Sequence, residues 1–105
     1  MSSTSPLPPR GLTLTWRGEI DLENAVEHRR ELARAMDRSD VVFVDLADVT
    51  LMDSTGLGVL LSGWRRARTH HGAVVVTNAR GQVRRSLEVM GVLHLLTALP
   101  GGLNG

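Results

Sequence analysis

Apolar and polar positions change period several times along this chain, and each period predicts one kind of element. Strict alternation or a short β-branched apolar run indicates a strand, whereas apolar residues three and four apart indicate a helix. The segments with a strand pattern are residues 12–17, 41–44, 73–76 and 93–96. The segments with a helical pattern are residues 22–36, 57–67 and 82–90. Strands and helices are therefore expected to alternate along the whole chain.

Individual residues mark the boundaries of the first two elements. Gly18 follows the alternating segment and is expected to end the first strand. Asp21 precedes the first helical segment, where a short side-chain oxygen can cap the free N–H groups of the first turn. Leu22 and Val26 then belong to the apolar stripe that this helix should turn toward the core.

The alternation of strands and helices predicts an α/β fold with a mixed, mainly parallel sheet of about four strands and helices packed on it. The length of 105 residues fits a single domain. Residues 1–10 contain three prolines, which lack the N–H donor that a strand needs. We expect an N-terminal tail in residues 1–10, the domain in residues 11–99 and a C-terminal tail in residues 100–105.

Parallel sheets bring the loops that follow their strands to one edge, where binding sites tend to form. In this chain these loops contain Asp21, the pair Asp53 and Ser54, and Asn78. We therefore expect these four side chains to be neighbours.

Composition excludes several functional classes. The formal net charge of +1 is too small for the basic field that non-specific nucleic-acid binding needs. The chain has no cysteine, no apolar run near the roughly 18 residues of a membrane span, and no signal-peptide core at its start. His70 and His71 are adjacent, so on a helix they would point about 100° apart, which does not favour a metal site. We expect a cytoplasmic protein without metal, cofactor, membrane insertion or direct nucleic-acid binding.

Ser54 stands where a strand pattern changes into a helical one. Its side chain could cap the helix, act as a nucleophile or act as a switch. A nucleophile elbow requires glycine two residues before the serine, but Met52 stands there, and no histidine has a spacing that forces it near. Asp53 is followed by two residues before Gly56, which is the wrong register for an aspartic protease. We therefore do not expect an enzyme.

Capping of the following helix is the simplest role for the hydroxyl and carboxyl side chains at residues 53–55. Gly56 and Gly58 indicate a constraint besides capping, because glycine early in a helix costs about 0.8 to 1 kcal/mol of stability relative to alanine. A close backbone approach at these glycines is expected, and a cap and a switch both stay open.

Residues 41–61, together with residues 18–21 and 83–93, resemble the STAS domain of bacterial anti-sigma factor antagonists. The resemblance covers residues 11–97. Residues 53–58 are similar to the phosphorylation motif of that family, with Ser54 at the acceptor position.

The resemblance implies a partner switch. The unphosphorylated protein would bind an anti-sigma factor that is also a serine kinase and so release the sigma factor, phosphorylation of Ser54 would end this binding, and a phosphatase would restore it. Ser54 is then expected to cap the helix while it is unmodified. The residues that the resemblance places at the partner interface are Asp21, Asp53, Ser54, Thr55, Gly56 and Leu57.

Relatives commonly begin with an extra strand and end with a further helix, and the resemblance implies that both are reduced or absent here. Such trimming would expose Leu12, Leu14 and Trp16 at an edge of the sheet, and a homodimer that covers them stays open as an alternative.

Other functions stay open as alternatives. The first is a STAS scaffold that is never phosphorylated, in a signalling complex or a membrane transport assembly. Another is a nucleotide sensor that uses the loops near Asp21 and Asn78, although the chain has no glycine-rich phosphate loop. A basic patch for an acidic partner is a further hypothesis, formed by Arg80, Arg84, Arg85 and the arginines of residues 65–68.

Overall fold

A three-stranded parallel sheet forms the centre of the computed structural model, which describes residues 11–99. The strands are β1 (Gly11–Ile20), β2 (Val41–Met52) and β3 (Ala73–Thr77), in the order β1-β2-β3. Residues 1–10 and 100–105 lie outside the described part of the chain. The expected tails, and the expected reduction of a first strand and a last helix, concern these residues. The predicted α/β fold with a mainly parallel sheet is confirmed.

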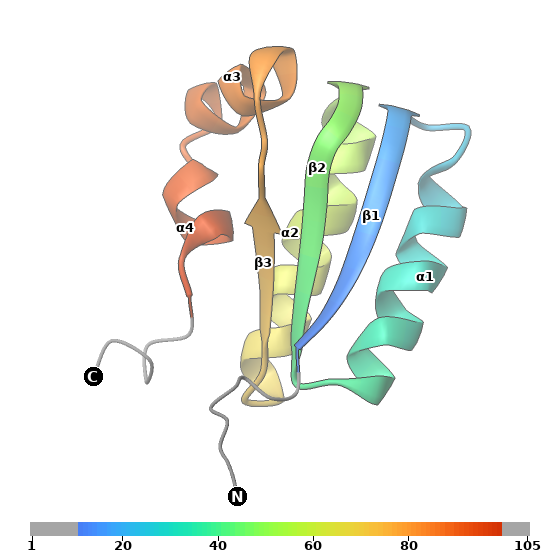
Figure 1. The fold of residues 1–105 in the computed structure, drawn as a ribbon, viewed down its shortest axis with the longest axis vertical. Coiled ribbons are helices and arrows are strands. Elements are labelled where there is room, and N and C mark those ends of the chain that lie inside the picture. The colour runs from blue at the N-terminus through green and yellow to red at the C-terminus, as the bar shows by residue number, and fades with distance from the viewer. Residues whose placement is uncertain (1–10, 100–105) are drawn as a thin grey trace, which may run out of the picture.

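Four helices accompany the sheet. Helices α1 (Ala25–Arg38) and α2 (Ser54–Thr69) make the crossovers between consecutive strands, and Figure 1 shows them on the same side of the sheet. Helices α3 (Gly81–Val89) and α4 (Leu93–Thr97) follow β3 and lie beside it. The face of β1 and β2 turned to the viewer in Figure 1 carries no helix.

The uncovered face of the sheet explains the burial pattern of the strands. In β2, Val42 and Val44 are fully buried, whereas Val41 and Phe43 on the opposite face are only half-buried. A continuous β-branched apolar run, as in residues 41–44 and 73–76, is typical of a strand buried on both faces. This interpretation is wrong for β2. It is confirmed for β3, in which residues 74–76 are all buried.

Two expectations about the elements are wrong, one for the end of β1 and one for residues 93–96. Gly18 does not end β1. It has a φ of 71°, and the pairing with β2 changes register between Gly18 and Glu19, so the strand continues through a bulge to Ile20. Residues 93–96 are not a strand but most of α4, in which Leu96 is buried and the Thr97 hydroxyl donates to the carbonyl of Leu93.

The first helix begins later than its apolar pattern predicts. It starts at Ala25, after a turn at residues 22–24, and buries Ala25, Leu32 and Ala35. Leu22 and Val26 were expected in the core, but they are 71% and 58% exposed. Two large apolar side chains therefore lie on the surface beside the end of β1.

The edge strand β1 is packed more completely than expected. Trp16 is buried, and its indole N–H donates to Glu31 on α1 at 2.9 Å. Leu12 and Leu14 are half-buried against the core, because they point to the helix-covered face. The prediction that these three residues are exposed is wrong, and it no longer supports a homodimer.

No helix within residues 11–99 is long and apolar enough to cross a membrane.

Candidate functional site

Two backbone donors at the end of β2 join it to the end of β1 and to α3. The amide of Asp53 donates to the carbonyl of Ile20 at 3.2 Å, and the amide of Met52 donates to the side-chain oxygen of Gln82 at 3.1 Å. The start of α2 is thus held between the end of β1 and the first turn of α3. Gln82 was placed in a helix by its sequence pattern, but nothing in that pattern marked it as part of the site.

Asn78 does not join this group. Strand β3 ends at Thr77, which pairs with Asp45, whereas β2 continues for seven more residues to Met52. At about 3.3 Å per residue, this leaves Asn78 roughly 20 Å from Ser54. The Asn78 amide instead donates to the Asp45 carboxylate at 3.2 Å. The prediction that Asn78 neighbours Asp21, Asp53 and Ser54 is wrong, because the strands differ in length.

Asp45 is stabilised in its ionised form at that lower position. The backbone N–H of Ala47, and secondly the amide of Asn78, donate to its carboxylate and lower its pKa. The Asp45–Asn78 contact therefore fixes the end of β3 and is separate from the site at Ser54.

Asp53, and not Ser54, caps α2. The Asp53 carboxylate accepts a hydrogen bond from the N–H of Gly56 at 3.0 Å, and the backbone of Asp53 is extended. Ser54 is the first residue of the helix, it is exposed, and its hydroxyl makes no hydrogen bond within the described residues. The expectation that Ser54 caps the helix is wrong, because the preceding carboxylate already has that role. The hydroxyl is accordingly available to an outside group.

Glycine is required at position 56 because α2 lies close to the ends of β1 and β2 there. A methyl group at Gly56 would lie 2.9 Å from a side-chain carbon of Ile20, from its carbonyl oxygen and from a side-chain carbon of Met52. This confirms the predicted close approach at one of the two glycines. At Gly58 a methyl group would meet nothing within 4 Å, so the expectation is wrong for that position.

The site residues expected from the sequence differ in how far their side chains are exposed to solvent. Ser54 is exposed, Asp21, Asp53 and Thr55 are half-buried, and Gly56 and Leu57 are buried. Gly56 and Leu57 therefore support the surface from beneath, although Leu57 also reaches the wall of a groove. Asp21 is engaged within its own turn, since its carboxylate accepts from the N–H groups of Glu23 and Asn24.

An open groove of about 380 Å³ lies between the start of α2 and α3. Ser54 and Asp53 stand on one side of it, and Arg85 and Ser86 on the other. Its remaining lining is mostly apolar: Met52, Leu57, Leu87, Val89 and Met90, together with Gln82. No histidine lines it; His28 packs edge-on against Trp16, and His71 and His94 line a different pocket. The groove leaves Ser54 accessible, and the carboxylate that lines it, Asp53, is engaged in capping α2.

Exposed apolar side chains gather at the same end of the molecule. Among the described residues, six large apolar side chains are exposed, and five of them lie near the carboxyl ends of the strands or line the groove. These five are Leu22, Val26, Leu51, Val89 and Met90. We call them the apolar rim. Of these five, Val89 and Met90 line the groove, and exposed apolar side chains beside a groove are typical of a site for protein binding.

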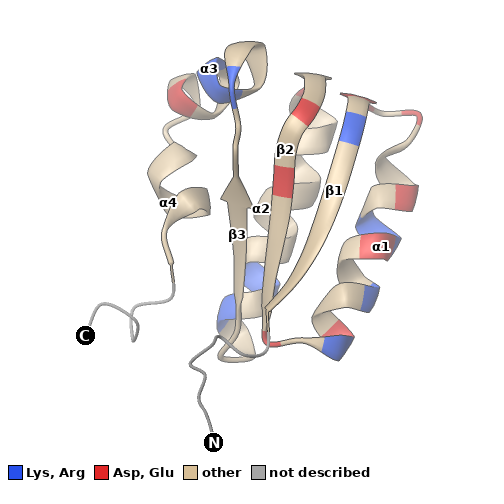
Figure 2. Cartoon of the chain, viewed as in Figure 1, with Lys and Arg blue, Asp and Glu red and all other residues tan. Residues whose placement is uncertain are grey.

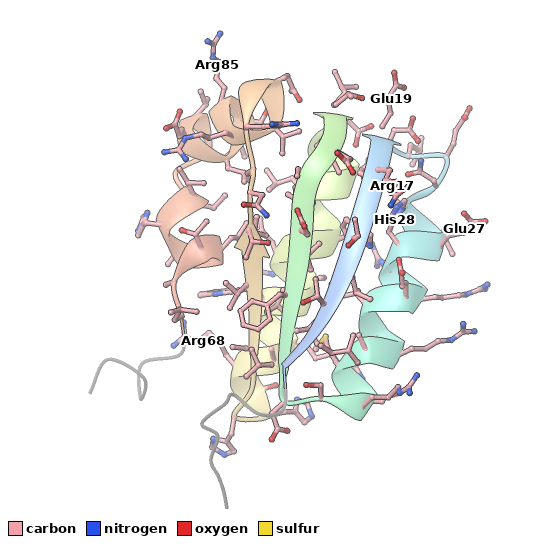
Figure 3. The ribbon with its side chains drawn as sticks, in the orientation of Figure 1. Arg17, Glu19, Glu27, His28, Arg68 and Arg85 are labelled. Atoms are coloured by element: carbon pink, nitrogen blue, oxygen red, sulfur yellow. The ribbon has the colours of Figure 1, made fainter. Side chains whose placement is uncertain are left out.

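The arginines do not form one basic patch. Figure 2 shows the arginines of α3 at one end of the molecule and those near the end of α2 at the other, and the labelled Arg85 and Arg68 in Figure 3 lie at these two ends. Several have local partners: Arg66 lies 4.0 Å from Asp37, Arg84 lies 3.3 Å from Glu88, and Arg68 stacks over Trp64. The hypothesis of a single patch that combines both groups is wrong.

A family model described as "Mlab, STAS domain" matches residues 4–97 of this chain. The chain belongs to the STAS domain family. The resemblance seen in residues 41–61 is thereby confirmed.

The proteins that this chain resembles include anti-sigma factor antagonists and a transporter domain. An anti-sigma-B factor antagonist of Listeria monocytogenes is 29% identical over 91 residues, which cover 84% of this chain and 80% of that protein. The structure of the anti-sigma factor antagonist SpoIIAA in its unphosphorylated form is similar, with a TM-score of 0.73 and 19% identity over 90% of this chain and 83% of that one. The STAS domain of a SulP transporter from Vibrio cholerae is also similar, with a TM-score of 0.64 and 21% identity over 88% and 72%. The last two likenesses show the shared fold.

Proposed function

We propose that this STAS domain is an anti-sigma factor antagonist that works by partner switching. In its unphosphorylated form it binds an anti-sigma factor that is also a serine kinase, and the sigma factor is released. Phosphorylation of Ser54 ends the binding, and a phosphatase restores it. The observation that carries the proposal is the position of Ser54: its hydroxyl is exposed on the first turn of α2, without a hydrogen bond among the described residues, beside an apolar groove and rim.

The phosphoryl transfer needs no catalytic group from this chain. The Ser54 oxygen forms a bond to the γ-phosphorus of ATP, the bond from that phosphorus to the β,γ-bridging oxygen breaks, and ADP leaves. The hydroxyl proton passes to a base of the kinase. The STAS domain supplies an accessible serine, held in place by the Asp53 cap and the contact at Gly56.

The energetics favour a loss of binding over a loss of folding. A phosphate adds about −1.5 to −2 charges at pH 7. At the first turn of α2 it gains about 0.3 to 1 kcal/mol from the helix dipole, so the domain stays folded. A partner that covers the apolar rim must remove water from this dianion, which costs on the order of several kcal/mol. The binding free energy lost at the interface is therefore larger than the folding free energy gained from the helix dipole.

A kinase assay tests this function. Wild-type protein, Ser54→Ala and Thr55→Val are each used to capture the anti-sigma factor kinase from the cells that produce the chain, and each is then incubated with it and ATP. Intact-mass spectrometry should show one added phosphate on the wild type and on Thr55→Val, and none on Ser54→Ala. Thr55 is the matched control because it is the neighbouring hydroxyl. Equal labelling of Ser54→Ala would overturn the assignment.

The second candidate is a STAS scaffold or a module of a transport assembly that is never phosphorylated. The similarity to the SulP transporter STAS domain favours it. In that case the apolar rim would bind a partner whether or not Ser54 is changed, and no variant would gain mass in the assay.

A further inference from the structure

The arginines near the start of α3 differ in what they contact. The Arg80 side chain donates to the carbonyl of Ala47 at 3.1 Å, and the Arg84 side chain donates to the Glu88 carboxylate at 3.3 Å. Arg85 is exposed and has no hydrogen bond or ion pair within residues 11–99. Figure 3 shows its side chain extending from α3 into solvent. Its guanidinium is therefore free to turn toward a new anion.

Arg85 is also the basic residue of the groove that Ser54 enters. The charged residues that line the groove are Asp53 and Arg85. The Asp53 carboxylate accepts the N–H of Gly56 and forms no ion pair with Arg85. A dianion on Ser54 would enter a space of about 380 Å³ in which Arg85 is the available counter-charge.

We propose that Arg85 binds the phosphoryl group on Ser54. The proposal rests on the phosphorylation of Ser54 in the proposed function and adds what happens within the domain afterwards. The guanidinium donates two parallel N–H bonds to phosphate oxygens, a geometry to which arginine is suited. Bound in this way, the two side chains close the mouth of the groove above its apolar floor of Leu57 and Leu87. Phosphorylation then removes a docking surface as well as adding charge.

The test needs neither the kinase nor the anti-sigma factor. Phosphoserine is incorporated at position 54 during translation, and the ³¹P chemical shift of the folded protein is followed from pH 4 to 9. An adjacent cation lowers the second pKa of a phosphate from its usual value of about 6. Arg85→Gln should raise that pKa by about 0.5 units relative to the phosphorylated parent. Arg84→Gln is the matched control and should change it by less than about 0.1 units.

A salt series adds a second readout. The difference between the parent and Arg85→Gln should shrink as NaCl rises to 1 M, where the screening length is about 3 Å. Circular dichroism confirms that each variant is folded, which is expected because both arginines are exposed. The proposal is wrong if Arg85→Gln leaves the phosphate pKa unchanged, or if both variants shift it equally. Since the phosphoserine is built in, this result is independent of whether a kinase modifies Ser54.

Discussion

At the amino end of the sheet the loops are closed by backbone contacts, whereas at the carboxyl end they leave apolar side chains in solvent. The amide of Ala73 donates to the carbonyl of Asp40 at 2.8 Å, and Gly72 lies directly against that carbonyl. A similar glycine contact exists at the other end, where Gly56 packs on Ile20. The two ends differ in their exposed side chains. The carboxyl end carries the five residues of the apolar rim, whereas within residues 11–99 Leu99 is the one large exposed apolar residue near the amino end.

The two ends of the sheet differ in surface exposure and not in the packing beneath the surface. Both are tightly built underneath, so exposure of the apolar rim is not the result of loose packing. An exposed apolar surface on a tightly packed base, with an exposed serine hydroxyl beside it, suits the binding of a partner that phosphate on that hydroxyl would weaken. Three predictions, in order of decreasing effect, test this separation of a packed base from a binding surface.

The largest effect is expected at Gly56. Gly56→Ala places a methyl group 2.9 Å from Ile20 and Met52 and should lower the free energy of unfolding by about 2 kcal/mol. Gly58→Ala is the control, because open space surrounds that position. It should raise the free energy of unfolding by about 0.5 to 1 kcal/mol through its better helix propensity. Urea denaturation measures both, and equal effects of the two substitutions would show that the contact at Gly56 is not tight.

The next effect concerns binding and not folding. Val89 and Met90 are 78% and 58% exposed and line the groove, so Val89→Ser with Met90→Ser should change the free energy of unfolding by less than about 0.5 kcal/mol. Binding to the anti-sigma factor should weaken about tenfold, which is about 1.4 kcal/mol. Leu99→Ser removes an exposed apolar residue at the opposite end and should leave binding unchanged. If Leu99→Ser weakened binding as much as the double variant, the two ends would not differ as described.

The smallest effect distinguishes the cap from the switch. Asp53→Ala removes the acceptor for the N–H of Gly56 and should lower the free energy of unfolding by about 1 kcal/mol. Ser54→Ala removes a hydroxyl without such a bond and should change it by less than about 0.3 kcal/mol. Thermal or urea unfolding compares them. A larger loss for Ser54→Ala would restore the serine as the cap.

Much of this architecture could be predicted from the sequence. The periodic segments indicate all three strands, and the sequence change at residues 53–58 marks the strand-to-helix junction where α2 begins, because these signals are local. The strand predicted at residues 93–96 is wrong because so short a run, three leucines interrupted by His94, suits a strand or a helix, and packing beside β3 decides between them. Periodicity also placed Leu22 and Val26 in the core, whereas the bulge at Gly18 and the turn after Ile20 leave them exposed.

The site itself depends on relationships that no single segment contains. Asp53 and Ser54 are both good caps by type, and only the three-dimensional structure shows which one bonds to Gly56. Gln82 enters the site because its side chain reaches the amide of Met52, 30 positions earlier in the chain. Asn78 is excluded because β3 is shorter than β2. Strand length and side-chain reach are tertiary properties, which explains why sequence patterns missed them.

On the proposed function, a phosphate on Ser54 ends the binding of this domain to its partner without unfolding the domain. Isothermal titration calorimetry with the anti-sigma factor, comparing unmodified protein with protein that carries phosphoserine at position 54, tests it most directly. The phosphorylated form should bind at least about a hundredfold more weakly, a difference of about 3 kcal/mol, while its thermal unfolding midpoint stays the same or rises slightly. Equal affinities of the two forms would contradict the account.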